Sequence, residues 1–197
     1  MSDVEKRVFT KPNSEAHWLE MRHDDVTSTE IAALFGCHGY GLTEYKLYHL
    51  KAGNLEDDFQ DNDRTKWGRR MEAAIAEGIA EDLGLLVEPF KDYGRIPSLR
   101  MGSSFDFKVY GIDDEWNGDD ETYRDLFREH GPGLVEVKNV DGMVFRRGWI
   151  DDGSVEAPPQ IEFQIQHQLE TAGLAWCLGA PLIGGNTPKP FYRLRDR

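Results

Sequence analysis

The sequence predicts an α/β domain with a central mixed β-sheet flanked by helices. Three observations indicate this class. Residues 14–83 carry helical signals, residues 85–110 read as successive strands, and a further strand at 134–140 precedes a long helix. With no repeat, low-complexity stretch or linker in its 197 residues, the chain is expected to form a single domain over 1–197.

Caps and apolar spacing predict the first helices. Residues 14–23 read as a short helix. Thr27 and Glu30 have the spacing of a capping box, which opens a helix ending at Gly36. Thr43 caps a further helix over residues 44–51.

A longer helix is predicted over residues 66–83, because apolar residues recur there every four positions. Its buried stripe is Met71, Ile75, Ile79 and Leu83. Three strand-like segments follow, at 85–90, 94–99 and 101–110.

The second half of the chain is predicted to alternate strand and helix. Residues 111–132 read as an acidic loop insert, and 134–140 as a strand with period two. Pro158 and Pro159 open a helix that is expected to run to Leu178. Its predicted apolar stripe is Ile161, Ile165, Leu169, Ala172 and Trp176. Two short strand-like segments, 181–183 and 191–194, close the chain.

Composition excludes several classes of protein. At 39% hydrophobic residues the chain can form a packed core, and no apolar run approaches the roughly 20 residues that a membrane span needs. No signal-peptide core precedes the first helix, so a cytoplasmic location is expected. Two cysteines are too few for a disulfide framework or an iron–sulfur cluster.

The net charge of −13 by itself argues against a nucleic-acid partner. Eleven of the thirteen negative charges, however, lie in two runs, residues 54–63 and 113–121. Both runs are predicted to be solvated loops that face outward. A non-catalytic acidic binding module, or a DNA mimic, remains an open alternative on charge alone.

One group of residues has the pattern of a catalytic site. Glu136 and Lys138 share one face of their predicted strand, since side chains alternate along a strand. Ser104 and Asp106 share a face of the segment 101–110. If the two strands are neighbours, Asp106 and Glu136 lie together at one edge.

Such carboxylates suit Mg²⁺, with Mn²⁺ as a substitute. The backbone carbonyl of Val137 is a further candidate ligand, and Glu72 a candidate third carboxylate. Lys138 is placed to orient or deprotonate a water. Taken alone, Glu136 and Lys138 also fit a plain structural salt bridge.

Six motifs in the same order resemble those of the YqaJ-type viral recombinase family, which includes lambda-type phage exonucleases with the restriction-endonuclease-like PD-(D/E)XK core. The resemblance covers about residues 16–185. One departure is Ser104-Phe105-Asp106-Phe107, where the family usually has Ser-Pro-Asp-Gly. The matching segments are WLEMRHDDVTSTEIAALFG (18–36), LTEYKLYHLKAG (42–53), WGRRME (67–72), SFD (104–106), EVK (136–138) and QIQHQLETAGLAWCLGAPLIGG (164–185).

The resemblance implies a metal-dependent 5′-to-3′ exonuclease that acts on the ends of linear double-stranded DNA and leaves 3′ tails for annealing recombination. It also implies a phage or prophage protein in a bacterial host, a homotrimer, and a single-strand annealing protein as partner. Gln164 is implied as a further catalytic residue that bonds Lys138 or the water, with Gln168 as the competing candidate.

Phosphate binding is expected from Arg22, whose guanidinium forks onto phosphate oxygens, and from Ser28 at a helix opening. An N-cap cluster together with a solvated Arg22 is the alternative. Ser104 is a third candidate. Further basic residues expected to contact the duplex backbone are Arg64, Lys66, Arg69, Arg70, Arg146 and Arg147.

Another PD-(D/E)XK enzyme, such as a restriction-type endonuclease, is the nearest alternative. Digestion of closed circular DNA would distinguish it from an exonuclease.

Overall fold

The computed structural model describes residues 6–56 and 60–196. The predicted class is confirmed, since helices accompany a mixed sheet of six strands. Close contacts divide the chain into two compact units, each made of three segments. The first comprises the described residues of Met1–Gln60, Lys91–Ser104 and Pro159–Gly173, and the second those of Asp61–Phe90, Phe105–Pro158 and Leu174–Arg197. A single domain over 1–197 stays a prediction.

The first unit is built on a four-stranded sheet in the order β1-β4-β5-β2, in which β2 and β5 are parallel. Helix α6 packs on β4 and β5 of this sheet. The elements of the unit are β1 (Val8–Thr10), α1 (Glu15–Asp24), β2 (Val26–Thr27), the 3-10 helix η1 (Ile31–Phe35), α2 (Glu44–Lys51), β4 (Tyr93–Ile96), the 3-10 helix η2 (Pro97–Leu99), β5 (Met101–Ser103) and α6 (Pro159–Ala172).

The capping box predicted at Thr27 forms only in part. A Glu30 side-chain oxygen accepts the Thr27 N–H at 2.9 Å, but the helix that follows is the short 3-10 helix η1, whose N-cap is Glu30 itself. Thr43 caps α2 as predicted, and Ser14, which was expected to be the first residue of the first helix, is the N-cap of α1.

The first unit buries polar groups that are paired with one another. Asp25 is fully buried, and its carboxylate accepts bonds from Arg95 at 2.7 Å and from the Tyr93 hydroxyl at 3.3 Å. Buried His167 lies 3.0 Å from the Ser103 hydroxyl, through its Nδ1. Burial lowers the pKa of His167 to about 4.

The second unit contains the six-stranded mixed sheet, with the order β11-β10-β7-β6-β3 and β12 paired to β10. Strands β7 and β10 are parallel and the other pairs antiparallel. The elements are α3 (Asp63–Asp82), β3 (Leu85–Pro89), β6 (Phe107–Ile112), α4 (Thr122–His130), β7 (Gly133–Val140), α5 (Gly142–Gly148), β8 (Ile150–Asp151), β9 (Val155–Glu156), β10 (Trp176–Ile183), β11 (Thr187–Pro188) and β12 (Phe191–Leu194).

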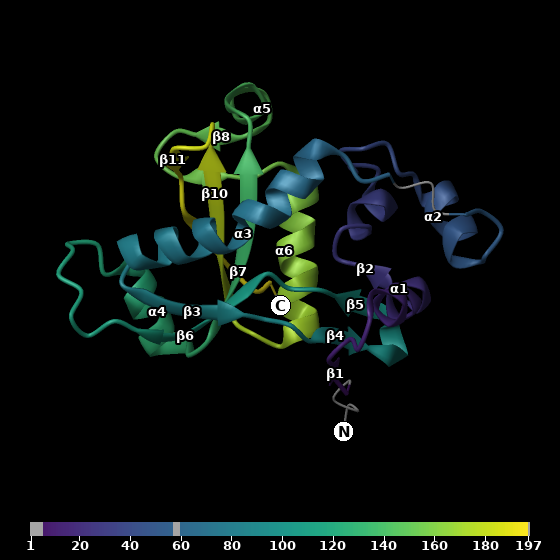
Figure 1. The fold of residues 1–197 in the computed structure, drawn as a ribbon, viewed down its shortest axis with the longest axis horizontal. Helices are drawn as coiled ribbons and strands as arrows, with labels where there is room; N and C mark the ends of the chain where they lie inside the picture. Colours follow the sequence, from purple (N-terminus) through teal and green to yellow (C-terminus); the bar gives the residue numbers. More distant parts are fainter. Residues whose placement is uncertain (1–5, 57–59, 197) are drawn as a thin grey trace. The chain divides into compact units, whose positions relative to one another are not determined.

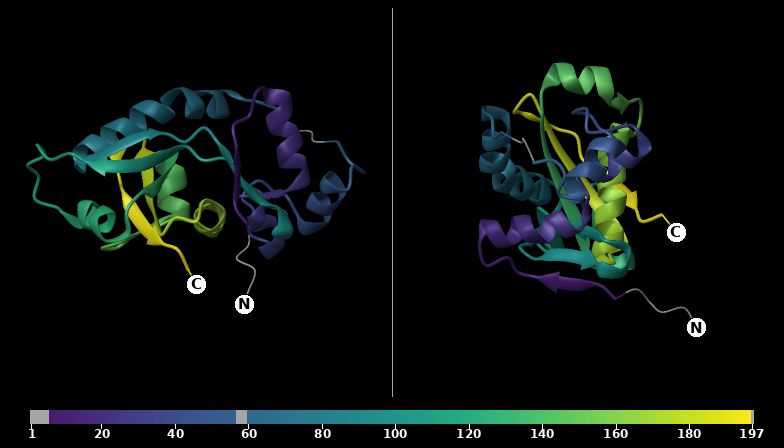
Figure 2. Two further views of the ribbon diagram at one scale, coloured as in Figure 1. Left: turned by 90° about the horizontal axis from the view of Figure 1, so that it is seen from below. Right: turned by 90° about the vertical axis from the view of Figure 1, so that its right-hand side faces the viewer.

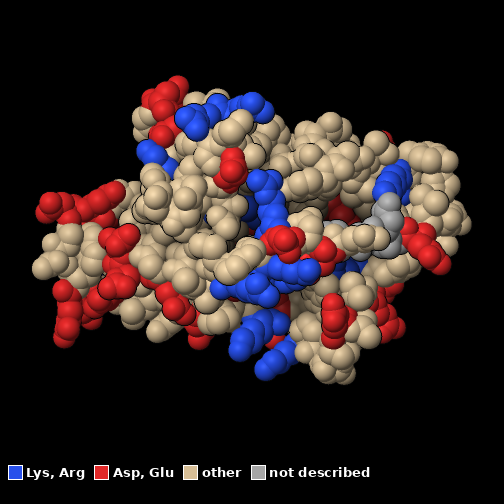
Figure 3. All heavy atoms as spheres, turned by 45° about the horizontal axis from the view of Figure 1, so that its top comes forward, with Lys and Arg blue, Asp and Glu red and all other residues tan. Residues whose placement is uncertain are grey.

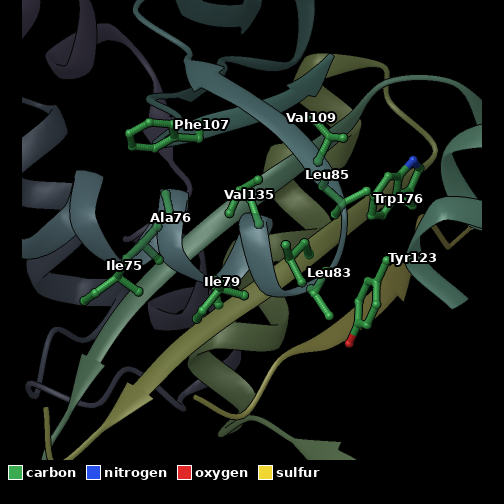
Figure 4. Packing of buried hydrophobic residues seen from close by; sticks show 14 residues of the cluster. Ile75, Ala76, Ile79, Leu83, Leu85, Phe107, Val109, Tyr123, Val135 and Trp176 are labelled. Atoms are coloured by element: carbon green, nitrogen blue, oxygen red, sulfur yellow. The ribbon is translucent and has the colours of Figure 1, made fainter. Parts of the chain in front are cut away.

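Helix α3 covers one face of this sheet (Figures 1 and 2). The predicted stripe is confirmed: Ile75, Ile79 and Leu83 are buried and Met71 packs against the core at its edge. Figure 4 shows Ile75, Ala76 and Ile79 of α3 in one cluster with Val135 of β7. Burying each such side chain contributes about 1.5–3 kcal/mol, and this holds the helix over the strand that carries Glu136 and Lys138.

Gly84 ends α3 with a positive φ of 65°, and the ring of Trp116 packs where its Cβ would be. The run 113–121 is an outlying loop as predicted, and Figure 3 shows acidic side chains gathered there. The other acidic run includes residues 57–59, which lie outside the described residues.

Several predicted boundaries are wrong. The helix predicted over 66–83 begins at Asp63, and residues 97–99, predicted to be in a strand, form η2. The segment 101–110 is two strands, β5 and β6, in different sheets. They are separated because Ser104 bonds to Trp18 and Asp106 to the amide of Val137 instead of continuing a strand ladder. Ser104 and Asp106 therefore do not share a strand face.

The insert 111–132 is not a loop throughout. It ends in α4, whose Tyr123, Leu126 and Phe127 pack on the core of the second unit. The i, i+3, i+4 spacing of these three residues is the sequence pattern that indicates the helix.

The helix that was expected to reach Leu178 ends at Ala172. Gly173 takes a positive φ of 70°, which terminates it. Trp176 then lies in β10, with its indole N–H donating to the Gly131 carbonyl at 3.0 Å.

Candidate active site

Strands β6 and β7 bring Asp106 and Glu136 together, as predicted. The antiparallel register pairs Phe107 with Val135, so Asp106, directly before β6, lies beside the middle of β7. Its Oδ2 accepts the backbone N–H of Val137 at 2.8 Å. This bond fixes the carboxylate just before β6 begins, beside the part of β7 that follows its last residue paired with β6, Val135.

Glu136 and Lys138 lie on one face of β7, two residues apart, and form an ion pair. The Glu136 side chain is only 2% exposed, whereas that of Lys138 is 28% exposed. The Lys138 side chain therefore reaches solvent, whereas the Glu136 side chain paired with it is buried. A charged pair of this kind in a strand interior is costly unless compensated or used.

The pKa values of two carboxyl groups at this site are shifted against their charged forms. Burial raises the pKa of Asp106 well above its usual range, and the charges of Glu136 and Glu72 raise it further. Burial also raises the pKa of Glu72 on α3, followed by the charge of Glu136. Lys138 opposes both shifts. Three carboxylates thus lie near the Lys138 ammonium in a poorly solvated place, and the charge of Arg69 also lowers the pKa of Glu72.

The donors at this site fit a hard divalent cation in kind, since all are oxygens and the excess negative charge would be offset by the ion. The Val137 carbonyl joins the same edge, because the N–H and C=O of one strand residue point to the same neighbouring strand. Among residues 6–56 and 60–196, however, no three His, Cys, Asp or Glu side chains are arranged as a metal-holding group. The predicted ligand set remains a prediction.

A second cluster lies within the first unit, around Trp18. Its indole N–H donates to the Ser104 hydroxyl at 2.8 Å, and the Arg22 guanidinium lies 4.6 Å from the centre of its ring. An Arg22 Nη approaches the Thr29 hydroxyl at 3.5 Å, while Ser28 is almost fully buried. The structure thus associates the predicted Arg22 and Ser104 through Trp18.

Sequence reasoning missed Trp18 and Thr29. The four-residue spacing of Trp18 and Arg22 on α1 places both on one helix face and was the available signal for the first. Thr29 stands in a Ser/Thr run, and nothing in the sequence distinguishes it from Ser28.

The sequence model of the YqaJ-like viral recombinase domain matches residues 17–175. The chain belongs to this family. The match includes both clusters described above, from Trp18 to Lys138. Membership confirms the resemblance that the six motifs indicated.

Solved structures similar to this member of the YqaJ-like family include an alkaline exonuclease from Laribacter hongkongensis, LHK-Exo, with a TM-score of 0.63 at 17% identity. The similarity covers 92% of this chain and 82% of that one. The complex of LHK-Exo with dAMP gives a TM-score of 0.62 at 18% identity, covering 92% and 83%. At these identities the likeness shows a shared fold. No curated protein matches significantly.

The two glutamines predicted for the YqaJ-like site lie on α6, in the first unit. Gln168 is buried, and its side-chain amide donates to the Ser104 carbonyl at 3.2 Å. Gln164 is half-buried. The choice of Gln164 as the residue that serves Lys138 stays a prediction.

The basic residues predicted to contact DNA are exposed on the second unit. Arg69 pairs with Asp61, Arg70 lies over the Trp67 ring at 5.1 Å, and Arg146 Nε donates to the Gly142 carbonyl at 3.2 Å. Figure 3 shows Lys and Arg side chains over the region of α5 and α3. Within the described residues, no helix is long and apolar enough to cross a membrane.

Proposed function

We propose that this protein is a divalent-metal-dependent nuclease that degrades one strand of linear double-stranded DNA from its 5′ end. The product would carry 3′ single-stranded tails for recombination by strand annealing. The observation that carries the proposal is the cluster of Asp106, Glu136 and Lys138 at the β6–β7 edge, in a chain of the YqaJ-like viral recombinase domain family. The likeness in fold to an alkaline exonuclease supports it.

Asp106, Glu136, the Val137 carbonyl and Glu72 would hold the ion, Mg²⁺ with Mn²⁺ as substitute. When bound, such an ion stabilises charge on the scissile phosphate and lowers the pKa of a water. Lys138, the partly exposed member of the cluster, would orient the attacking water as an ammonium, and would accept a proton from that water only as the neutral amine. Glu136 holds the Lys138 ammonium in place.

Arg22 and Ser104, with Ser28 or Thr29, would bind a phosphate group at the DNA end. Arg69, Arg70 and Arg146 would contact the duplex backbone. Gln164 would bond to Lys138 or the water. A homotrimer and a single-strand annealing protein are the further partners we propose, and a mass measurement in solution tests the first. A bacterial cytoplasm hosting a phage or prophage is the proposed setting.

The direct test is digestion of linear and closed circular duplex DNA, each with Mg²⁺ or with excess EDTA. We expect loss of the linear substrate only, and only with Mg²⁺. Cleavage of the closed circle would favour the restriction-type endonuclease instead. Digestion in EDTA would contradict the metal requirement, and no digestion at all would favour the non-catalytic binding module.

Two substitutions test the site. Lys138→Ala should abolish digestion, whereas Lys108→Ala should not, because Lys108 pairs with Glu88 at the surface. Arg22→Ala should remove a preference for 5′-phosphorylated over 5′-hydroxyl ends. Equal wild-type rates on the two kinds of end would reject the phosphate role of Arg22.

A further inference from the structure

The inward-facing stripe of α3 changes in character along the helix. Its C-terminal part carries the buried Ile75 and Ile79, and the half-buried Glu72 lies one turn nearer the N-terminus. Gly68 lies one further turn back on the same face, about 6 Å along the helix axis from Glu72. The stripe therefore passes from core residues to a carboxylate of the candidate active site, and then to a residue without a side chain.

The first turns of α3 lie next to the candidate active site. The side-chain amide of Asn139, the residue after Lys138, donates to Met71 Sδ at 3.5 Å, so the helix crosses β7 at this point. In Figure 1 the helix passes over β7 and its first turns extend past that strand. Gly68 belongs to these turns, beyond the hydrophobic packing that holds the rest of the helix on the sheet.

No feature of the folded chain requires a glycine at position 68. The φ angle of Gly68 is not positive, so its backbone is ordinary helix that other residues adopt as readily. Apart from the helix backbone and the two adjacent residues, a methyl group there would have no atom of the described residues within 4 Å. Because glycine inside a helix is less stable than alanine, Gly68 weakens α3 without a packing contact in return.

A cation and a carboxylate flank Gly68 along this face. Arg64 is exposed one turn before it, and Glu72 lies one turn after it. The pKa of Asp141 is lowered first by bonds from two backbone N–H groups and then by the charge of Arg64, which places Arg64 near the end of β7. A nucleic-acid strand presents its phosphates to cations and to metal ions, with bulky sugars between them. The row of Arg64, Gly68 and Glu72 matches this alternation.

We infer that Gly68 is a specificity-determining residue, whose missing side chain leaves room for the sugar–phosphate backbone of the cut strand to lie against α3 between Arg64 and Glu72. Close approach of the protein backbone to a ligand is one of the situations in which proteins use glycine. The inference rests on the proposed function, because it assigns a path to the strand that the nuclease degrades. A side chain at position 68 would displace the scissile phosphate from Glu72.

The test compares Gly68→Ala with Gly78→Ala. Gly78 is the matched control because it also lies inside α3, has no positive φ, and has the same open space around an added methyl group. Both variants should raise the thermal midpoint by about 2–4 °C, because alanine favours a helix over glycine. A loss of activity in Gly68→Ala would then not come from misfolding.

On linear duplex DNA the two variants should differ. Gly68→Ala should lower kcat/KM about 100-fold, the effect that a displacement of about 1 Å at a reacting group can have. Gly68→Leu should lower it further, because leucine is larger and is also a strong helix former. Gly78→Ala should keep the wild-type rate. The Mg²⁺ concentration that gives the half-maximal rate should be the same in all of these proteins.

A second measurement does not depend on hydrolysis. In EDTA, with Lys138→Ala present in every protein, adding Gly68→Ala should weaken the affinity for linear duplex DNA about 10-fold through steric overlap, whereas adding Gly78→Ala should not change it. If the wild type hydrolyses nothing but this selective loss of affinity is observed, the proposed function fails and the inference about Gly68 stands. If the wild type binds no duplex DNA, both fail.

Four other outcomes would overturn the role of Gly68. Wild-type rates in both alanine variants would show that the space around Gly68 is not used. Equal slowing of both would mean that a stiffer α3 limits the reaction. A higher Mg²⁺ requirement in Gly68→Ala alone would place the added methyl group against the metal ion, and a smaller mass in solution for that variant alone would place it against a second copy of the chain.

Discussion

Both units of this protein bury ionisable groups, and they differ in how the charge is compensated. In the first unit the buried carboxylate of Asp25 has Arg95 and Tyr93 as partners, and His167 stays neutral beside Ser103. In the second, Asp106 and Glu136 are joined by a third carboxylate and share Lys138. Removing one partner of a buried ion pair is costly for stability, whereas carboxylates crowded together with raised pKa values are typical of chemical sites.

The largest effect on DNA digestion is expected for the substitution Asp106→Asn. The asparagine keeps an oxygen for the Val137 amide but removes a repelled, poorly solvated charge, so the thermal midpoint should stay the same or rise. Digestion of linear duplex DNA should fall about 1,000-fold, which corresponds to about 4 kcal/mol in the barrier. Parallel measurement of rate and melting checks both. A folded variant with full activity would remove Asp106 from the site.

Asp25→Ala should have the opposite signature. It leaves Arg95 without its buried carboxylate, which typically costs about 3 kcal/mol in the free energy of unfolding. Chemical denaturation of the variant measures this, with Asp25→Asn as the milder comparison because it keeps an acceptor. An unchanged free energy for the alanine variant would contradict a structural role for the pair.

His167 should make the first unit sensitive to acid. Its pKa is about 4 when folded and about 6.5 when unfolded, so the unfolded chain binds more protons between these values. The contribution of neutral His167 to the free energy of unfolding is fully present above about pH 6.5. It is lost as the pH falls toward 4. Between pH 7 and 5 the loss is about 2 kcal/mol.

Denaturation curves of the wild type and of His167→Gln at several pH values isolate this contribution, since other titrating groups act on both proteins. The difference in free energy of unfolding between the wild type and His167→Gln should narrow as the pH falls. A constant difference would show that His167 is not held neutral by burial.

The smallest effect is expected for Lys108→Ala. Lys108 lies on β6 two residues from Asp106, but its pair with Glu88 is partly exposed to solvent. Exposed pairs contribute about 0–1 kcal/mol, so stability and digestion should both stay close to those of the wild type. A large loss in either would mean that Lys108 belongs to the cluster of Asp106 and Glu136.

Local periodicity in the sequence was sufficient to predict the buried side of α3 and the face of β7 that carries Glu136 and Lys138. The stripe Ile75, Ile79 and Leu83 predicted α3 and its buried side, and alternation in β7 placed Glu136 and Lys138 on one face. Both follow from geometry that repeats every few residues. The order of the six motifs predicted the family, which the match over 17–175 confirms.

Tertiary structure alone decided where strands break and which side chains meet. Ser104 and Asp106 leave the strand because their partners are Trp18 and the Val137 amide, 86 and 31 residues away in the chain. The grouping of Thr29 with Arg22 around Trp18 likewise depends on the path of the chain after α1. Such bonds are absent from local sequence patterns because each joins segments whose contact exists only after folding.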